Sequence, residues 1–231
     1  MKRFYSQVTP RALEAGWQVM LDERGIKTVK GAGQIVPTEA LAQILAREWE
    51  DQGDTIDPAL LVGRDMADYA IDILSAQLPQ SVDKLLAYAE TDTLCYRADP
   101  EDALYKRQQD EWEPLLSAFE RREGVKLARV SGVLHAPQPP DALEALRTRL
   151  AHENAFALAG LETVTSLAAS LVCALSACEP DGDPAAVWRA ASLEEEWQAE
   201  LWGRDEEAEA RRARRSADFL RAVEFVKAAR G

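Results

Sequence analysis

An acidic stretch with two tryptophans, LEEEWQAELWGRDEE from Leu193 to Glu207, gathers the side chains with the most chemical potential in this chain. Glutamates at this density could hold a metal ion, act as a general acid and base, or rim a surface that binds another protein. On a helix, successive side chains turn by about 100°, so Glu194, Glu195 and Glu196 point in different directions. The triplet alone is therefore not a carboxylate cluster, and a metal or acid–base site would need carboxylates from other segments.

The helical period sorts this stretch into two neighbouring stripes. The first combines acidic, polar and aromatic residues, namely Glu194, Gln198, Leu201, Trp202 and Asp205. The second holds Leu193, Trp197 and Glu200. Two interpretations stay open. The helix is either a solvated acidic element whose tryptophans pack inward, or it presents an aromatic face rimmed by acids, which is typical of protein-binding surfaces.

Cys95, in the segment TDTLCYRA, is the candidate nucleophile. The nearby Arg97 could lower the pKa of its thiol, but a thiol nucleophile also needs a positioned base. The chain has only two histidines, His135 and His152, and neither is near Cys95 in sequence. The alternative function that stays open is an enzyme with a site based on Cys95 or on carboxylates, between two domains.

Dedicated metal and cofactor motifs do not occur in the sequence. It contains no HExxH, CxxC, GxSxG or Walker loop. Cys173 and Cys178 are five residues apart on an expected helix, which places them on different faces, so both are predicted to lie in the core. We therefore expect no metal site and no cofactor.

The composition of the chain limits the classes of partner that it can bind and indicates its cellular compartment. Forty Asp and Glu against 27 Lys and Arg give a net charge of -13, which disfavours nucleic acid and anionic lipid. The apolar run TVTSLAASLVCALSAC is too short and too rich in Ser and Thr to cross a membrane, which needs roughly 18–20 apolar residues. Three cysteines and the absence of a leader pattern after MKRFYSQVTP predict a cytoplasmic protein, and the acidic composition favours a monomer when free.

The elements that position these residues fall into two parts. Strand patterns at Trp17–Asp22, Ile26–Val29 and QIV predict a small antiparallel meander, followed by a helix capped by Thr38. Gly53 and Pro58 mark a boundary. We expect an α+β fold, with a β-rich domain with one helix at 1–57 and a larger multihelical domain at 58–231.

Periodic apolar residues predict most of the second part to be helical. Helices are expected at 67–76, 81–90, 100–124, 142–151, 153–178 and 184–201, and from 205 almost to the end. The segment VKLARV after Gly124 is expected to be a short strand, which could return to the first sheet.

Four segments, in this order and at these separations, carry a resemblance to a known family. They are REWEDQ (Arg47 to Gln52), TDTLCYR (Thr91 to Arg97), RQQDEWEPLL (Arg107 to Leu116) and LEEEWQAELWGRDEE. Together they resemble the assembly chaperones of the ATP synthase alpha subunit, found in mitochondria and alphaproteobacteria. The resemblance spans nearly the whole chain. It implies a chaperone without enzymatic activity, in the bacterial cytoplasm, that binds the unassembled alpha subunit, shields its interface and promotes assembly of the catalytic head.

The same resemblance implies roles for individual residues. It places Glu194, with Gln198, Leu201, Trp202 and Asp205 on the same face, in the client-binding surface, or in direct support of it. It implies structural roles for a second group, namely Trp49, Asp92, Arg97 and Trp112. Within TDTLCYR we expect a buried polar network in which Asp92 and Arg97 pair.

Overall fold

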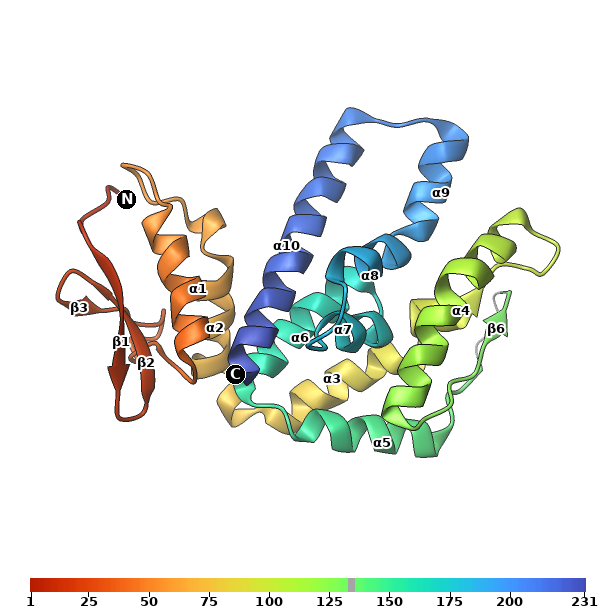
Figure 1. The fold of residues 1–231 in the computed structure, drawn as a ribbon, viewed down its shortest axis with the longest axis horizontal. Helices are drawn as coiled ribbons and strands as arrows, with labels where there is room; N and C mark the ends of the chain where they lie inside the picture. Colours follow the sequence, from red (N-terminus) through yellow and green to blue (C-terminus); the bar gives the residue numbers. More distant parts are fainter. Residues whose placement is uncertain (133–135) are drawn as a thin grey trace. The chain divides into compact units, whose positions relative to one another are not determined.

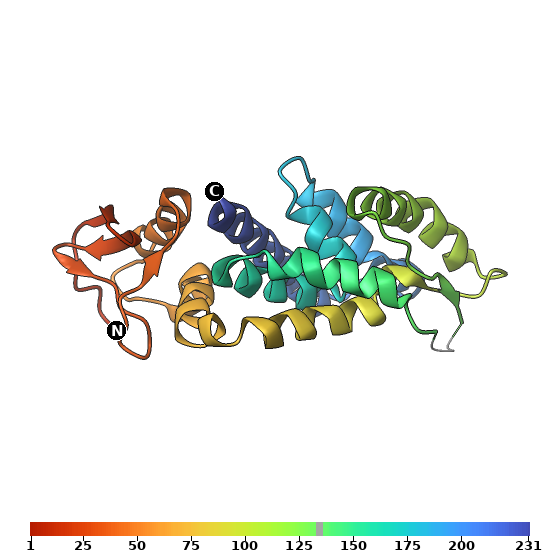
Figure 2. The ribbon, with the colours of Figure 1, turned by 90° about the horizontal axis from the view of Figure 1, so that it is seen from below.

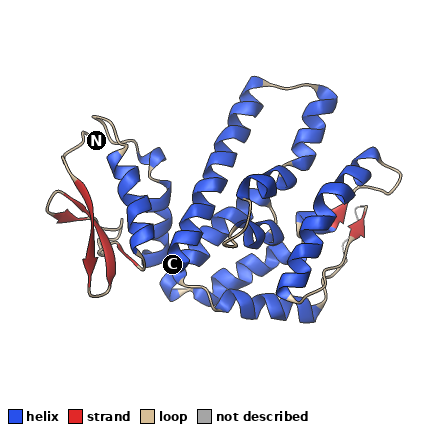
Figure 3. Cartoon of the chain, in the orientation of Figure 1, coloured by secondary structure: helices blue, strands red, loops and turns tan. Residues whose placement is uncertain are grey.

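The structure is a computed structural model that describes residues 1–132 and 136–231 (Figure 1). His135, considered above as a base for Cys95, lies outside the described residues. The chain divides into two compact units. The first comprises Met1–Ser81, Glu153–Gly160 and Glu224–Gly231, and the second comprises Val82–His152 and Leu161–Val223. The larger sheet lies in the first unit, and the described part of the second is helical apart from one short pair of strands (Figure 3). The α+β class is confirmed.

The first unit begins with an antiparallel sheet centred on one strand. Its members are β1 (Val8–Leu13), β2 (Gly16–Leu21), β3 (Arg24–Gly25) and β4 (Ile35–Val36), and β2 pairs with each of the other three. The tight turn between β1 and β2 requires glycine, because Gly16 has a φ of +137° and a Cβ there would lie 2.4 Å from the carbonyl oxygen of Val36. The sheet is antiparallel as predicted, but β4, which lies in the expected strand QIV, pairs with β2 and not with the strand expected at Ile26–Val29.

The strand expected at Ile26–Val29 is displaced. Regular pairing ends at Gly25, and the chain beyond it forms a loop in which the amide of Gln34 donates to the carbonyl of Ile26. The hydroxyl of Thr28 donates to Asp72 at 2.7 Å. The loop obtains further hydrogen bonds from β2, where the carbonyl of Val19 accepts from the backbone N–H of Ile26 at 3.0 Å, and from within the loop itself, so a regular strand is not needed here.

The helices of the first unit follow the four strands in the chain and cover the sheet. They are α1 (Glu39–Glu50), η1 (Pro58–Leu60), α2 (Val62–Asp72) and η2 (Leu74–Ala76). Thr38 caps α1 as predicted, accepting a hydrogen bond from the amide of Leu41. Trp49 is buried, with its ring edge-on to Tyr5. Because α2 supplies Asp68 and Asp72 to the loop after β3, the first unit extends to Ser81, whereas the sequence placed a boundary after residue 57.

The second unit is built around helices of very different lengths. They are α3 (Leu78–Glu90), α4 (Ala103–Glu123), α5 (Pro140–Ala151), α6 (Ala155–Ala168), α7 (Leu171–Ala177), α8 (Pro184–Ala191), α9 (Leu193–Trp202) and α10 (Glu206–Arg230). One end each of α3, α6 and α10 belongs to the first unit. Viewed from below, α5 runs along α3 (Figure 2), and Arg147 on α5 pairs with Asp83 on α3 at 2.5 Å.

Two helices expected to be continuous are broken in the structure. The expected helix at 153–178 stops at Ala169, which has a φ of +49°, and Ser170 then caps α7 by accepting from the amide of Cys173. The expected helix at 184–201 divides at Ser192 into α8 and α9. The apolar period continues across both breaks, so periodicity alone predicted single helices.

Asp92 is fully buried and accepts hydrogen bonds from the residues at the first of these breaks, between α6 and α7. Its carboxylate accepts hydrogen bonds from the hydroxyl of Ser170 at 2.7 Å and from the amide of Val172 at 2.9 Å. Burial raises the pKa of Asp92 to about 6, although these hydrogen bonds act in the opposite direction. The expected Asp92–Arg97 pair is not formed: Arg97 pairs with Glu113 at 3.1 Å and donates to Gln109 at 2.6 Å.

A cluster of ion pairs on α4 holds the segment that follows it. Arg129 pairs with Glu113 at 2.7 Å and also with Glu120, whose side chain is 1% exposed. This segment ends in β6 (Val130–Ser131), which pairs in parallel with β5 (Tyr96–Arg97) and does not return to the first sheet. Hydrogen bonding from the Arg129 guanidinium lowers the pKa of Glu113 to about 2, although burial opposes this change.

We predict that Glu113→Gln destabilises the protein and makes its unfolding free energy depend less on pH in acid. Because the pKa of Glu113 is lowered on folding, its contribution to stability is present above about pH 4.5 and is lost as the pH falls through about 2. The variant should lose about 1–3 kcal/mol of unfolding free energy at pH 7. Urea unfolding between pH 7 and pH 2 measures both effects. Equal pH slopes for the two proteins below pH 4.5 would contradict this account.

Candidate functional site

Helix α9 and the first turns of α10 form a hairpin in the second unit (Figure 1). Gly203 ends α9 with a φ of +95°, a conformation that favours glycine, and its amide still donates to the carbonyl of Ala199. Asp205 caps α10 by accepting a hydrogen bond from the amide of Ala208 at 2.9 Å. Only Leu193 in α9 is buried. Contacts made by polar side chains therefore hold most of this helix in place.

One face of α9 contacts α4. Arg107 on α4 pairs with Glu200 at 2.6 Å, and its guanidinium lies over the ring of Trp197, 5.7 Å from the centroid. The neighbouring residue, Gln108, donates from Nε2 to the carboxylate of Glu194 at 2.7 Å. The stripe of Leu193, Trp197 and Glu200 predicted from the helical period therefore faces the protein.

A second face of α9 contacts α10 through ion pairs. Glu195 pairs with Arg215 at 2.6 Å, and Glu196 pairs with Arg212 at 2.9 Å and with Arg204. The three successive glutamates thus have three different sets of partners, as expected from their 100° separations. Among the described residues, Glu194 is the only glutamate of α9 without an arginine partner.

The third face of α9 is open to solvent. Trp202 is 79% exposed and Leu201 is 58% exposed, so the inward-packed interpretation of this helix end does not hold for Trp202. A groove of about 460 Å³ between α9 and α10 is lined by Gln198, Trp202 and Asp205, together with small residues and arginines. The structure brings these three predicted residues together, whereas Glu194 and Leu201 lie outside the groove lining.

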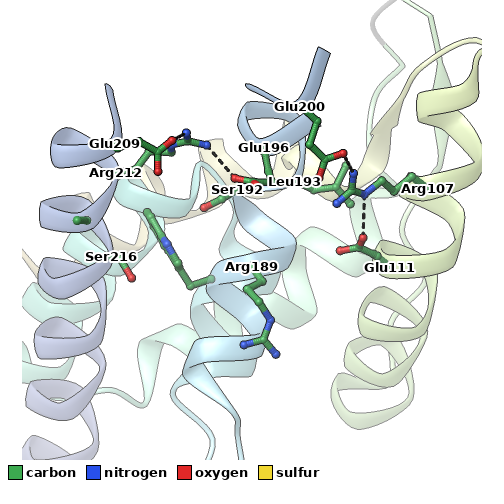
Figure 4. Close-up of a pocket in the computed structure, with 12 residues that line it drawn as sticks. Arg107, Glu111, Arg189, Ser192, Leu193, Glu196, Glu200, Glu209, Arg212 and Ser216 are labelled. Atoms are coloured by element: carbon green, nitrogen blue, oxygen red, sulfur yellow. Dashed lines mark hydrogen bonds and ion pairs between the residues drawn. The ribbon is translucent and has the colours of Figure 1, made fainter. Parts of the chain in front are cut away.

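A second cavity, of about 640 Å³, adjoins α4, α8, α9 and α10 (Figure 4). Arg107 lies between Glu111 and Glu200, and Arg212 lies between Glu196 and Glu209. Sequence reasoning did not assign roles to Arg107 and Gln108, whereas the spacing of Glu209 and Arg212 does indicate the ion pair that they form. The i,i+4 spacing of Arg107 and Glu111 was a usable signal, but nothing in the sequence shows partners that lie on other helices.

The residues expected to be structural lie in the interior. Trp112 is fully buried and donates from its indole nitrogen to the carbonyl of Ala190 at 2.8 Å. The guanidinium of Arg97 lies over the Trp112 ring, 5.7 Å from its centroid. Together with the buried Trp49 and Asp92, these placements fit structural roles, which remain a proposal.

Cys95 has the environment of an inert core thiol. Burial raises its pKa to about 12, and the nearby charge of Asp92 acts in the same direction. Within the described residues, no group of three or more His, Cys, Asp and Glu side chains could hold a metal ion. None of the described helices is long and apolar enough to span a bilayer.

Comparison with known proteins shows which family of proteins this chain is similar to. The family model of the ATP12 chaperone protein matches residues 2–120. The mitochondrial protein atp12 of Schizosaccharomyces pombe is 25% identical over 219 residues, covering 90% of this chain and 75% of that protein.

Two solved structures closely match the fold. The crystal structure of Atp12 from Paracoccus denitrificans is 35% identical with a TM-score of 0.91, covering 99% of this chain and 98% of that one. The Atu1473 protein of Agrobacterium tumefaciens is 34% identical with a TM-score of 0.94, covering 98% of this chain and 85% of that one.

We predict that the three cysteines resist alkylation in the native protein. Cys95, Cys173 and Cys178 are all buried, and burial raises the pKa values of Cys95 and Cys173. Intact-mass measurement after iodoacetamide treatment at pH 8 should show no adduct without denaturant and three adducts in urea. Rapid single labelling at Cys95 in the native state would contradict this prediction and support Cys95 as a nucleophile.

We also predict that two tryptophan substitutions differ sharply in their effect on stability. Trp202→Ala removes an exposed side chain and should change the unfolding free energy by less than about 0.5 kcal/mol. Trp112→Ala empties a fully buried position and should cost about 3–5 kcal/mol. Urea unfolding of both variants tests this, and similar losses would mean that Trp202 packs in solution.

Proposed function

The chain belongs to the ATP12 chaperone protein family, and from this premise we propose that it binds the unassembled alpha subunit of ATP synthase. In this proposal it shields the interface that the alpha subunit will use in the assembled head, and it promotes assembly of that head. It does so as a non-enzymatic protein, without a cofactor. Its site of action is the bacterial cytoplasm, and it is monomeric when free.

The exposed end of α9 is the observation that carries this proposal. Trp202 and Leu201 are adjacent and are 79% and 58% exposed. Tryptophan in a solvated position is an anchor residue of protein interfaces, because it buries a large area at a small cost in conformational entropy. Here it borders a groove lined by Gln198 and Asp205. An unassembled subunit that exposes apolar surface is a suitable partner for such an anchor.

Glu194 supplies a charge near the opposite end of α9, about 12 Å along the helix from Trp202. Glu195, Glu196 and Glu200 are paired with arginines, so much of the acidity of this helix is compensated within the chain. Among the residues that the structure describes, Glu194 has the neutral amide of Gln108 as its side-chain partner. Its negative charge is therefore available to a cationic group on a client, which favours specific orientation over simple apolar capture.

The enzyme alternative gains no support from Cys95. Its side chain is buried, and the raised pKa keeps the thiol protonated near neutral pH. A chaperone that masks an interface needs no nucleophile, and the high negative charge of the chain helps keep a complex dispersed. The net charge of -13 is thus consistent with the proposed role, and it disfavours binding to nucleic acid.

The test is co-expression of this chain with the ATP synthase alpha subunit alone, followed by size-exclusion chromatography. We expect the wild-type chain to keep the alpha subunit soluble and to elute with it in the absence of nucleotide. Trp202→Ala and Glu194→Lys should remain folded and lose most of the co-eluting alpha subunit, because they remove the anchor and invert the available charge.

Matched controls in the first unit separate this effect from general changes in composition. Val29→Ala shortens a side chain that is 76% exposed, and Glu23→Lys makes the same charge change at a side chain that is 91% exposed. Both should retain the alpha subunit. An aggregated alpha subunit with the wild-type chain would refute the function, whereas rescue by all variants would refute only the site.

A further inference from the structure

We propose that Gln108 is a positioning residue that fixes the carboxylate of Glu194 for client binding. This inference rests on the proposed function, and it assigns a task to the RQQDEWEPLL segment. The two residues are 86 positions apart in sequence, yet the side chain of Gln108 donates to Glu194 at 2.7 Å. Gln108 does not reach the client itself, because its side chain is fully buried. It acts through Glu194.

The orientation of the Gln108 amide is determined by its two partners. Its Oε1 accepts a hydrogen bond from the backbone amide of Ala98 at 2.8 Å. Its Nε2 must then face the other side, where it donates to Oε1 of Glu194. The flipped amide would set two donors against each other at Ala98 and two acceptors against each other at Glu194. Only one arrangement satisfies both contacts.

The part of α4 that carries Gln108 is held in place by buried contacts. Gln108 lies on α4, one turn before the buried Trp112, which donates to the carbonyl of Ala190 at the end of α8. The same helix therefore holds both sides of the α8–α9 junction. By contrast, α9 itself buries only Leu193, so apolar packing does little to orient Glu194. The hydrogen bond from Gln108 is the contact that fixes its carboxylate.

A neutral amide suits this task better than an arginine. The other glutamates of α9, Glu195, Glu196 and Glu200, have arginine partners that compensate their charge. Gln108 restrains Glu194 without compensating its charge, and Oε2 of Glu194 has no partner among the described residues. Binding then costs less side-chain ordering, and the full charge meets the client.

A double-mutant cycle tests whether Gln108 acts through Glu194. Gln108→Met keeps the length of the side chain and removes its hydrogen bonds. We expect it to weaken binding of the alpha subunit about three- to tenfold, the effect of leaving one long side chain to be ordered on binding. In the Glu194→Ala background the same substitution should change the dissociation constant by less than about twofold, because the group it positions is gone.

A purely structural role for Gln108 predicts a different result. Gln108→Met also leaves the amide of Ala98 without its acceptor, and this cost to stability is the same in both backgrounds. Thermal unfolding should therefore show similar losses with Glu194 and with Ala at position 194. If the affinity falls by the same factor in both backgrounds, the positioning role is refuted.

Gln108→Asn gives an independent test should Gln108→Met fail to fold. The shorter neutral amide cannot span from the amide of Ala98 to Glu194, so binding should weaken beside Glu194 and stay unchanged in the Glu194→Ala background. Equal weakening in both backgrounds refutes the inference. Failure of the wild-type chain to bind the alpha subunit refutes the proposed function as well. Wild-type binding that Glu194→Ala leaves unaltered refutes the positioning role while the chaperone function stands.

Discussion

The hydrogen bond from the Trp112 indole to the carbonyl of Ala190 is the contact on which the candidate surface depends. It forms in a fully buried environment at 2.8 Å, where an unpaired carbonyl or indole would cost about 1–3 kcal/mol. Ala190 lies near the end of α8, two residues before Ser192, where the chain enters α9. By holding that carbonyl, α4 determines where α9 begins. The direction of every side chain on α9 follows from that starting point.

Beyond its first residue, α9 is placed by polar contacts on two sides. Arg107 and Gln108 hold it from α4, and the arginines of α10 hold it through Glu195 and Glu196. Solvent-exposed ion pairs contribute only about 0–1 kcal/mol each, so their main effect is to orient the helix rather than to stabilise the fold. The remaining face of α9, with Trp202, has no packing partner within the described part of the chain. A helix fixed by apolar packing would have used its tryptophans for that purpose.

The sequence predicted those features that arise from local rules. The cap at Thr38 and the separation of the α9 glutamates both follow from helical geometry. Features that depend on distant partners were missed. The positive φ of Ala169 is stabilised by capping at Ser170 and by the buried carboxylate of Asp92, 78 residues earlier. Asp92 and Arg97 are neighbours in sequence, but each finds a better partner in another element.

The pairing pattern changes how the acidity of this chain should be understood. In the sequence, LEEEWQAELW reads as a strongly negative segment, yet three of its four glutamates lie against arginines. Because the opposite charges of each pair lie only about 3 Å apart, a partner farther away meets a dipole and not a net charge. Glu194 remains as a single defined charge on the helix that carries Trp202. In the complex that we propose, Trp202 supplies the apolar contact and Glu194 supplies the charged one.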